Sequence, residues 1–468
     1  MIENHQKTID LGNIKYSIND KEKIACVIGC NKSINDIYIP RSIKYESKEF
    51  IVTSIFSFAF QDYKNLKKIE FSNESKLQII GCHSFDGTSI ESIKIPSSVT
   101  EIGNGSFYLC KKLQKIEINE DSNLQKIGSE AFYSTLINEI TIPSKLIELS
   151  EGWCTYTTKL NKVKVSPNNP RYYFYDDKFL IGKSSINQAN YNQLVFCVRN
   201  AETAKIPCFI ECICTSVFEA CEHLKKVEIS PQSNLQTIKK FAFSESSIKS
   251  ISIPSQVKYI GERSFAFCLN LKRIEFQTDS KLQTIDKNAF RFSAFEKICI
   301  PSNVTFIGYG AFSCCKKLKR IQFSNDSMLK EIDHAAFNES SIASFYVPSN
   351  VVRICKNAFS HCCNLTEVKF AEDSKLDSFE ELVFAYTPIR SITILPSISE
   401  LKKGWCAGTL NSNECKIMPN FPYFLYYDNK MIIGKNFKSD YLYFVNRSLK
   451  EFIFPPFIKK IGAYAFSE

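Results

Sequence analysis

The chain contains few of the residues that carry out chemistry. Its 468 residues include five His, two Trp, four Met and 16 Gly. The histidines form no His-Glu-x-x-His motif, no Gly-x-Ser-x-Gly motif occurs, and the glycines do not gather into a phosphate-binding loop. We therefore expect no catalytic residues, no enzyme activity and no cofactor.

Long apolar stretches and long runs of one charge are also missing. No run of about 18 apolar residues predicts a membrane span, and the polar residues 1–7 lead into no stretch of signal-peptide length. The net charge of +10 comes from 59 basic and 49 acidic residues spread along the chain. We expect neither a transmembrane segment nor a nucleic-acid partner.

Cysteine, in contrast, is plentiful. The 19 cysteines are an odd number, so a complete disulfide framework would leave at least one thiol over. Cys26 and Cys30 could pair, although their spacing cannot establish it. The densest group of possible metal ligands comprises Cys208, Cys212, Cys214, Cys221 and His223. Its spacing is not that of a zinc finger or zinc ribbon, so we predict no metal site.

An internal repeat dominates the sequence. A small residue followed by Phe recurs with gaps that alternate between 25 and 22 residues within each block, so that two turns make a period of 47. These steps end at Phe60, Phe85, Phe107, Phe132, Phe243, Phe265, Phe290, Phe312, Phe337, Phe359 and Phe466, with Val-Phe versions at Phe218 and Phe384. Prolines give the same period independently, at Pro207, Pro254, Pro301 and Pro348.

The apolar pattern around each Phe predicts the structure of one turn. A Leu-x-x-Ile-x-Ile segment, as at residues 113–118, alternates with period two and predicts a short, half-buried strand. The Ser-Phe or Ala-Phe step predicts a compact helical or irregular turn on the opposite side. Because one such turn cannot bury its apolar face alone, we expect the turns to stack into a solenoid.

The repeated unit resembles a known family. The pattern Ile-Gly-x-x-(Ala/Ser)-Phe-x-x-Cys-x-x-Leu-x-x-Ile, as at residues 260–274, is similar to the BspA-type leucine-rich repeat, a family with many surface antigens of bacteria and protozoan parasites. The resemblance implies a curved, mainly β repeat solenoid with one short strand per turn of 22 or 25 residues. It also implies short helical turns on the convex side and an N-terminal β-hairpin cap.

A second-order repeat predicts the domain organisation. Gly152-Trp153-Cys154 matches Gly404-Trp405-Cys406, and a predicted hairpin follows each of them. We expect a β cap at 1–59, repeats at 60–153, a hairpin insertion at 154–205, repeats at 206–405, a second insertion at 406–454 and the start of a third block at 455–468. This last block is either truncated or left as a frayed turn.

Stacking predicts columns of equivalent side chains. The position three residues after Phe is cysteine in one class of turn, and we assign these residues to a buried structural column: Cys110, Cys221, Cys268, Cys315 and Cys362. Charged residues flank the central Ile or Val of the predicted strands at Lys68, Glu70, Lys115, Glu117, Lys162, Lys164, Lys226, Glu228, Arg273, Glu275 and Arg320. They predict a basic row beside a mainly acidic row, which serves either solubility or partner binding.

The predicted hairpins add a second candidate surface. Tyrosines at Tyr173, Tyr175, Tyr426 and Tyr427 offer large contact areas with a polar group, although hairpin packing would equally explain them. We hypothesise a monomeric adhesion or recognition protein that binds a protein or an extracellular-matrix macromolecule. The resemblance implies a cell-surface location. An intracellular scaffold for protein interactions, located in the cytoplasm, is the alternative, because no targeting signal is visible.

Overall fold

The computed structural model describes residues 6–409, 414–417, 422–428, 430–434, 440–446, 449, 451 and 453–466. These residues form two compact units. Unit 1 comprises residues 1–201 and 213–223, and unit 2 comprises residues 202–212 and 224–468. Parts of the insertion predicted at 406–454 lie outside the described residues. Within the described part of the chain, no helix is long and apolar enough to cross a membrane.

Unit 1 begins with the predicted β-hairpin cap. The first three strands pair antiparallel in chain order, and the third pairs parallel with the sixth, against which the fifth folds back. Alternate residues of these strands, such as Tyr16, Val27 and Phe50, are buried, so the cap closes the end of the repeat core. The cap strands are β1 (Gln6–Leu11), β2 (Ile14–Asn19), β3 (Ile24–Cys30), β4 (Asp36–Ile39), β5 (Ser42–Tyr45) and β6 (Lys48–Ile55).

The repeats form a β-solenoid in which most turns contribute two strands. The longer strand of a turn, such as β25 (Arg273–Phe276), holds the predicted strand segment, which here reads Ile-x-Phe. The shorter strand, such as β26 (Thr284–Ile285), ends directly before the Phe turn. The prediction of one strand per turn is wrong in this respect, because two residues are too few for a period-two pattern to be visible.

The strands of unit 1 follow this plan between residues 68 and 165. The longer strands are β7 (Lys68–Phe71), β9 (Ser92–Lys94), β11 (Lys115–Glu117), β13 (Glu139–Ile142) and β15 (Lys162–Val165). The shorter strands are β8 (Ile79–Ile80), β10 (Glu101–Ile102), β12 (Lys126–Ile127) and β14 (Glu148–Leu149). The shorter strands pair parallel with one another and continue the sheet of the cap.

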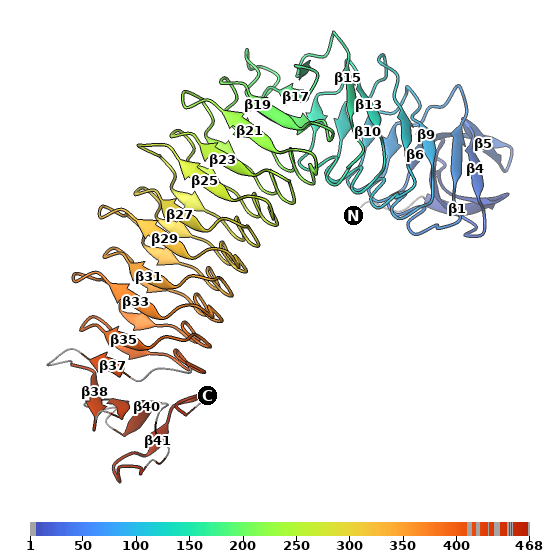
Figure 1. The fold of residues 1–468 in the computed structure, drawn as a ribbon. Helices are drawn as coiled ribbons and strands as arrows, with labels where there is room; N and C mark the ends of the chain where they lie inside the picture. Colours follow the sequence, from blue (N-terminus) through green and yellow to red (C-terminus); the bar gives the residue numbers. More distant parts are fainter. Residues whose placement is uncertain are drawn as a thin grey trace. The chain divides into compact units, whose positions relative to one another are not determined.

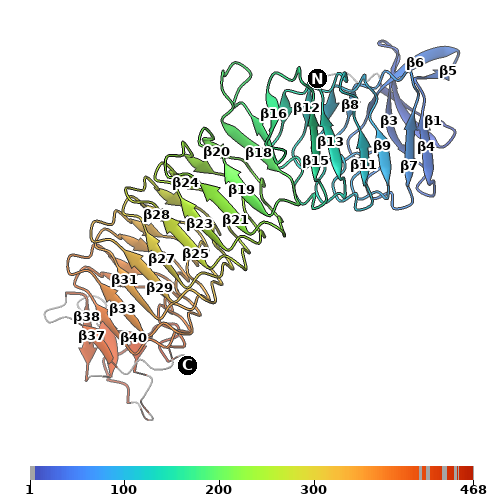
Figure 2. The same cartoon turned by 45° about the horizontal axis from the view of Figure 1, so that its top comes forward.

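Unit 2 repeats the plan, with the two kinds of strand in two separate rows (Figures 1 and 2). The longer strands are β19 (Thr203–Ile206), β21 (Lys226–Ile229), β23 (Ser250–Ile253), β25, β27 (Lys297–Ile300), β29 (Arg320–Phe323), β31 (Ser344–Val347), β33 (Glu367–Phe370), β35 (Ser391–Ile394) and β37 (Glu414–Ile417). The shorter strands are β22 (Thr237–Ile238), β24 (Tyr259–Ile260), β26, β28 (Phe306–Ile307), β30 (Glu331–Ile332), β32 (Arg353–Ile354), β34 (Ser378–Phe379) and β36 (Glu400–Leu401). β20 (Cys212–Ile213) spans the boundary between the units.

The turn that carries each Phe is not helical in any described repeat. Around Phe265 the backbone is left-handed at Arg263 (φ +51°) and at Phe267 (φ +56°), and the equivalent positions are left-handed in most other turns. The N–H groups of these three residues donate to carbonyls of the next turn at 2.8 to 2.9 Å. Because a helix would use such N–H groups within its own segment, the prediction of short helical turns is wrong.

The Phe side chains form a continuous buried stack in the core of each unit. Neighbouring ring centroids lie 5.2 to 5.5 Å apart from Phe60 to Phe132 in unit 1. They lie 4.9 to 5.6 Å apart from Phe243 to Phe384 in unit 2. Parallel rings at this spacing are offset-stacked and exclude water, which explains why one aromatic type recurs.

Antiparallel strands follow each Trp-marked turn. In unit 1 they are β16 (Tyr172–Tyr175), β17 (Phe179–Gly182) and β18 (Gln193–Cys197). Asp176 and Asp177 join the first two with φ values of +53° and +50°, which suits aspartate in a tight turn. In unit 2 the equivalent strands are β38 (Phe424–Tyr427), β39 (Met431–Gly434) and β40 (Tyr441–Val445), and β41 (Lys460–Ile461) pairs with the last of them.

Candidate partner-binding surface

The longer strands expose two rows of side chains, which we call the long-strand face. Along β25 the side chain of Ile274 is buried, whereas those of Arg273 and Glu275 on either side are 70 % and 51 % exposed. The strand period of two places every such flanking pair on the solvent side. The residue before the buried Ile or Val belongs to the first row, and the residue after it belongs to the second row.

In unit 1 the predicted charges pair along single strands. Lys68 binds Glu70 at 2.7 Å, and Lys115 binds Glu117 at 2.5 Å. Between them, the strand β9 places Ser92 opposite both lysines, so an uncharged side chain separates the two in the first row. Because the paired side chains are well exposed, each ion pair contributes under about 1 kcal/mol to stability.

The last rung of unit 1 has an excess of positive charge. Lys162 and Lys164 of β15 both bind Glu139 of the neighbouring strand β13, at 3.0 and 2.7 Å. The hydrogen bond from Lys164, and then that from Lys162, lowers the pKa of the Glu139 carboxyl. Two ammonium groups around one carboxylate leave one positive charge facing solvent.

In unit 2 two of the predicted strands again pair their own charges. Lys226 lies 2.5 Å from Glu228, and Arg273 lies 2.5 Å from Glu275. Arg273 donates from both Nε and Nη2 to the same carboxylate oxygen, which holds the guanidinium flat along its strand.

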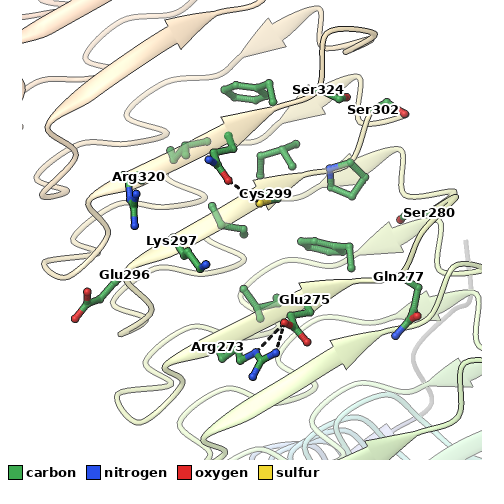
Figure 3. Close-up of a pocket in the computed structure, with 18 of the residues that line it drawn as sticks. Arg273, Glu275, Gln277, Ser280, Glu296, Lys297, Cys299, Ser302, Arg320 and Ser324 are labelled. Carbon is green, nitrogen blue, oxygen red and sulfur yellow. Dashed lines mark hydrogen bonds and ion pairs between the residues drawn. The ribbon is translucent and has the colours of Figure 1, made fainter.

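The centre of unit 2 brings three cations together in the first row. Arg273, Lys297 and Arg320 lie at corresponding positions of the neighbouring strands β25, β27 and β29 (Figure 3). They line a groove of about 1620 Å³. Neither Lys297 nor Arg320 forms an ion pair with any described residue. Beside them, the second row holds the uncharged Cys299 and Gln322, whose Sγ and Oε1 atoms lie 3.1 Å apart.

Lys297 and Cys299, which flank the buried Ile298, were not among the predicted surface residues. The signal that could have found both is the 47-residue period, which places Lys297 and Cys299 at the positions of Ser250 and Ser252. Tyr38 and Tyr346, which are 56 % and 50 % exposed on strands β4 and β31, were also outside the predicted set. Tyr38 borders a second groove, of about 1220 Å³, on the long-strand face of unit 1.

The structure separates the hairpin tyrosines by burial. Tyr172 is buried, and its hydroxyl accepts a hydrogen bond from the Leu149 N–H at 2.9 Å. Tyr173 and Tyr175 on the same strand are 53 % and 37 % exposed. In unit 2 the predicted tyrosines Tyr426 and Tyr427 also differ in burial.

Tyr426 is half-buried in β38, whereas Tyr427 is 37 % exposed. The Tyr427 ring meets that of Phe457 edge-on at 5.5 Å. The candidate contacts of both hairpins therefore come from alternate residues of one strand.

The column cysteines lie inside the stack, and four of them bind the backbone. Each of the four donates from Sγ to the carbonyl oxygen of a Phe in the preceding turn at 3.0 to 3.1 Å. Burial raises the pKa of these thiols to about 12. The four are Cys110, Cys268, Cys315 and Cys362.

Cys221, the fifth column residue, has a different environment. Its Sγ accepts a hydrogen bond from the buried Arg199 guanidinium at 3.4 Å. Arg199 also donates to the carbonyl oxygens of Val217 and Ser216, and it packs over the ring of Phe196. This buried cation lies within unit 1, in the segment predicted as the first insertion.

The structure gathers metal-ligand side chains at a place that the sequence analysis did not select. Among the described residues, only Asp333, His334 and Cys355 bring three ligand atoms within 4.8 Å of one another. The group around Cys208 and His223 does not meet this criterion. Cys26 and Cys30 are both free thiols, so they do not pair.

A family model for the BspA type leucine rich repeat region matches residues 53–179, 190–309 and 283–411 in six copies. The chain belongs to the BspA-type leucine-rich-repeat family. Members of this repeat class serve in protein interaction and are generally not enzymes. No curated protein matches the chain.

Solved structures share the BspA-type fold. The pneumococcal vaccine antigen PcpA is 19 % identical, covers 88 % of this chain and 98 % of its own, and gives a TM-score of 0.55. A leucine-rich cell surface protein from Faecalibacterium prausnitzii is 20 % identical, covers 79 % and 96 %, and gives a TM-score of 0.50. Identities this low show a common fold alone.

Proposed function

We propose that this BspA-type protein is a non-enzymatic recognition protein that binds a protein or matrix macromolecule at the cell surface. The observation that carries the proposal is the row of Arg273, Lys297 and Arg320 along one groove. Two of these cations have no acidic partner among the described residues, so they are available to an anionic ligand. A structural relative from Faecalibacterium prausnitzii that is a cell surface protein is in keeping with this location.

The partner we infer is acidic and extended. Successive longer strands repeat the same exposed positions, so a groove over three strands offers cations at regular intervals to carboxylates or sulfates on one chain. Exposed tyrosines on the long-strand face and the hairpins would add apolar contact area with a polar end. Affinity would then come from several modest contacts rather than one deep pocket.

Binding of defined polyanions tests this proposal. The triple variant R273S/K297S/R320S should bind immobilised poly-glutamate and heparin at least about ten-fold more weakly than the wild type in biolayer interferometry. The matched control K240S/K258S/K330S removes the same charge at exposed lysines outside the groove. An equal loss in both variants, or no loss in either, would contradict binding in the groove.

A second candidate function, an intracellular interaction scaffold, is favoured by the thiols. The 18 cysteines that the structure describes are all free thiols. Free thiols are typical of proteins in a reducing compartment. Antibody labelling of intact and permeabilised cells separates the two candidates. Labelling of intact cells supports the surface proposal, and labelling only after permeabilisation supports the scaffold.

A further inference from the structure

We propose that Asp333, His334 and Cys355, together with Glu331, form a zinc site that joins two neighbouring turns of unit 2. The ligand atoms of the first three residues lie within 4.8 Å of one another. Asp333 Oδ1 lies 2.6 Å from His334 Nδ1, and Cys355 Sγ lies 3.6 Å from Glu331 Oε1. In a tetrahedral zinc site the ligand atoms are about 3.5 Å apart, so small side-chain rotations would suffice.

The shorter strands bring these residues together. Glu331 lies in β30, and Asp333 and His334 directly follow this strand. Cys355 directly follows β32, which pairs parallel with β30 through Ile332 and Ile354. The strand ends therefore lie side by side in adjacent turns. The Asp333 and Cys355 side chains are largely buried, whereas that of His334 is 49 % exposed and leaves the ion a route from solvent.

A structurally equivalent pair of turns lies 47 residues earlier in the same unit. Asp286 and Asp333 each receive the N–H of the following residue on Oδ1, and each donates its own N–H to the strand of the preceding turn at 2.9 Å. Gly308 and Cys355 make matching backbone hydrogen bonds, at 2.8 and 2.9 Å. The two places therefore share one backbone arrangement and differ only in side chains.

Three replacements favour metal binding at the later place, whereas the replacement of Phe306 by Arg353 adds a cation near Glu331. Thr284, Lys287 and Gly308 are replaced by Glu331, His334 and Cys355, so each replacement introduces a ligand-type side chain. In addition, the Tyr259 hydroxyl binds the second oxygen of Asp286. Phe306 stands relative to Asp333 where Tyr259 stands relative to Asp286. Because Phe306 has no hydroxyl, it leaves the second oxygen of Asp333 unoccupied by such a bond.

The position of Cys355 holds glycine in the equivalent earlier turn, at Gly308. A Cβ atom built at Gly308 would lie 2.8 Å from the Lys287 backbone N and 2.9 Å from the Asp286 backbone C. Side chains are nevertheless accommodated at this position in other turns, where Asp286, Asp333 and Lys402 stand. The bearing of Cys355 on the proposal is therefore its place, because its Sγ lies within 4.8 Å of the ligand atoms of Asp333 and His334 in the preceding turn.

The set of ligand types selects zinc. A thiolate, an imidazole and carboxylates suit Zn²⁺, whereas Mg²⁺ and Ca²⁺ prefer oxygen ligands alone. Arg353 lies 3.7 Å from Glu331, but its side chain is 54 % exposed and can turn to solvent when the ion binds. Because stability in a solenoid depends on contacts between nearest neighbours, an ion held by two turns would stabilise that part of the stack.

Back-substitution to the residues of the earlier turn tests the proposal without endangering the fold. We would prepare C355G and H334K in the full chain, with C299S as the control for an exposed thiol. Titration with Zn²⁺ by calorimetry should show one binding event in the wild type and in C299S. In C355G and H334K the affinity of that event should fall at least about ten-fold. With Co²⁺, the thiolate-to-metal absorption band should disappear in C355G.

Thermal unfolding separates a metal site from a merely structural cysteine. Zn²⁺ should raise the Tm of the wild type and of C299S but not that of C355G, with the Tm of each protein in EDTA as its own baseline. An unchanged Co²⁺ band in C355G, or the same zinc-induced rise of Tm in all four proteins, would overturn the proposal.

Discussion

At the scale of single residues, the column cysteines show how a repeated position serves the stack. The Cys268 thiol is buried and donates to the Phe243 carbonyl oxygen at 3.0 Å, while Ser246 lies 3.6 Å away. The thiol thus adds a second donor to a backbone acceptor that already receives the Ser246 N–H at 3.1 Å. A small side chain with a donor is required there, and cysteine fills the space with little desolvation cost.

Replacing Cys268 by Ala should destabilise the protein by about 1 kcal/mol, because the Phe243 carbonyl would lose its side-chain donor inside the core and keep only the Ser246 N–H. Replacing it by Ser should cost less, since the hydroxyl can donate in the same direction. Urea denaturation followed by circular dichroism measures both changes. The exposed Cys299→Ser is the control, and equal midpoints for Cys268→Ala and Cys299→Ser would contradict the argument.

Thiol reactivity should divide the cysteines by burial. Because burial raises the pKa of Cys110, Cys268, Cys315 and Cys362 to about 12, these groups stay protonated until the pH approaches that value. At pH 8 we expect the reagent DTNB to react rapidly with the exposed Cys208, Cys299 and Cys363. The column should react only in denaturant, and rapid labelling of the column in the native protein would show that it opens.

At the scale of the elements, the Phe turn is the unit from which each repeat is built. Phe265 stacks between Phe243 and Phe290 at 4.9 and 5.3 Å, fully buried. Two residues later, Phe267 is 40 % exposed and stacks on Phe292 at 4.8 Å. The same turn therefore holds one core ring and one surface ring.

These two rings allow a matched comparison. Phe265→Ala should cost about 3–5 kcal/mol, because it opens a cavity in the continuous stack. Phe267→Ala should cost no more than about 1.5 kcal/mol, the contribution of an aromatic pair beyond its burial. Chemical denaturation of both variants tests the difference. A similar loss of unfolding free energy in the two variants would mean that the exposed Phe267–Phe292 pair stabilises the turn as much as the buried stack does.

At the scale of the whole molecule, contacts in a solenoid join nearest neighbours, so damage should stay local. Hydrogen exchange on Phe265→Ala should show faster exchange at residues 240–290 of unit 2. Residues 350–380 of the same unit should keep the protection that they have in the wild type. Uniformly faster exchange over both regions would instead indicate that unit 2 unfolds as one cooperative body.

Much of this architecture could be predicted from the sequence, because the same residue pattern recurs in every turn. The spacing of Phe107 and Phe132, the Ile-x-Ile steps and the 47-residue prolines determined the stack, the buried cysteine column and the charged flanks of the longer strands. The two-residue strands and the left-handed residues beside each Phe could not be predicted. Their hydrogen bonds run between turns, and a linear pattern does not show them.

The sequence by itself determined which residues recur, since stacking identical turns needs only the period. Only the tertiary structure decided which of them meet: the unpaired cations at Lys297 and Arg320, and the group of Asp333, His334 and Cys355. The physical reason is that residues 22 or 23 positions apart become neighbours only when adjacent turns pair in register. Ion pairing and ligand distance depend on that register rather than on residue type.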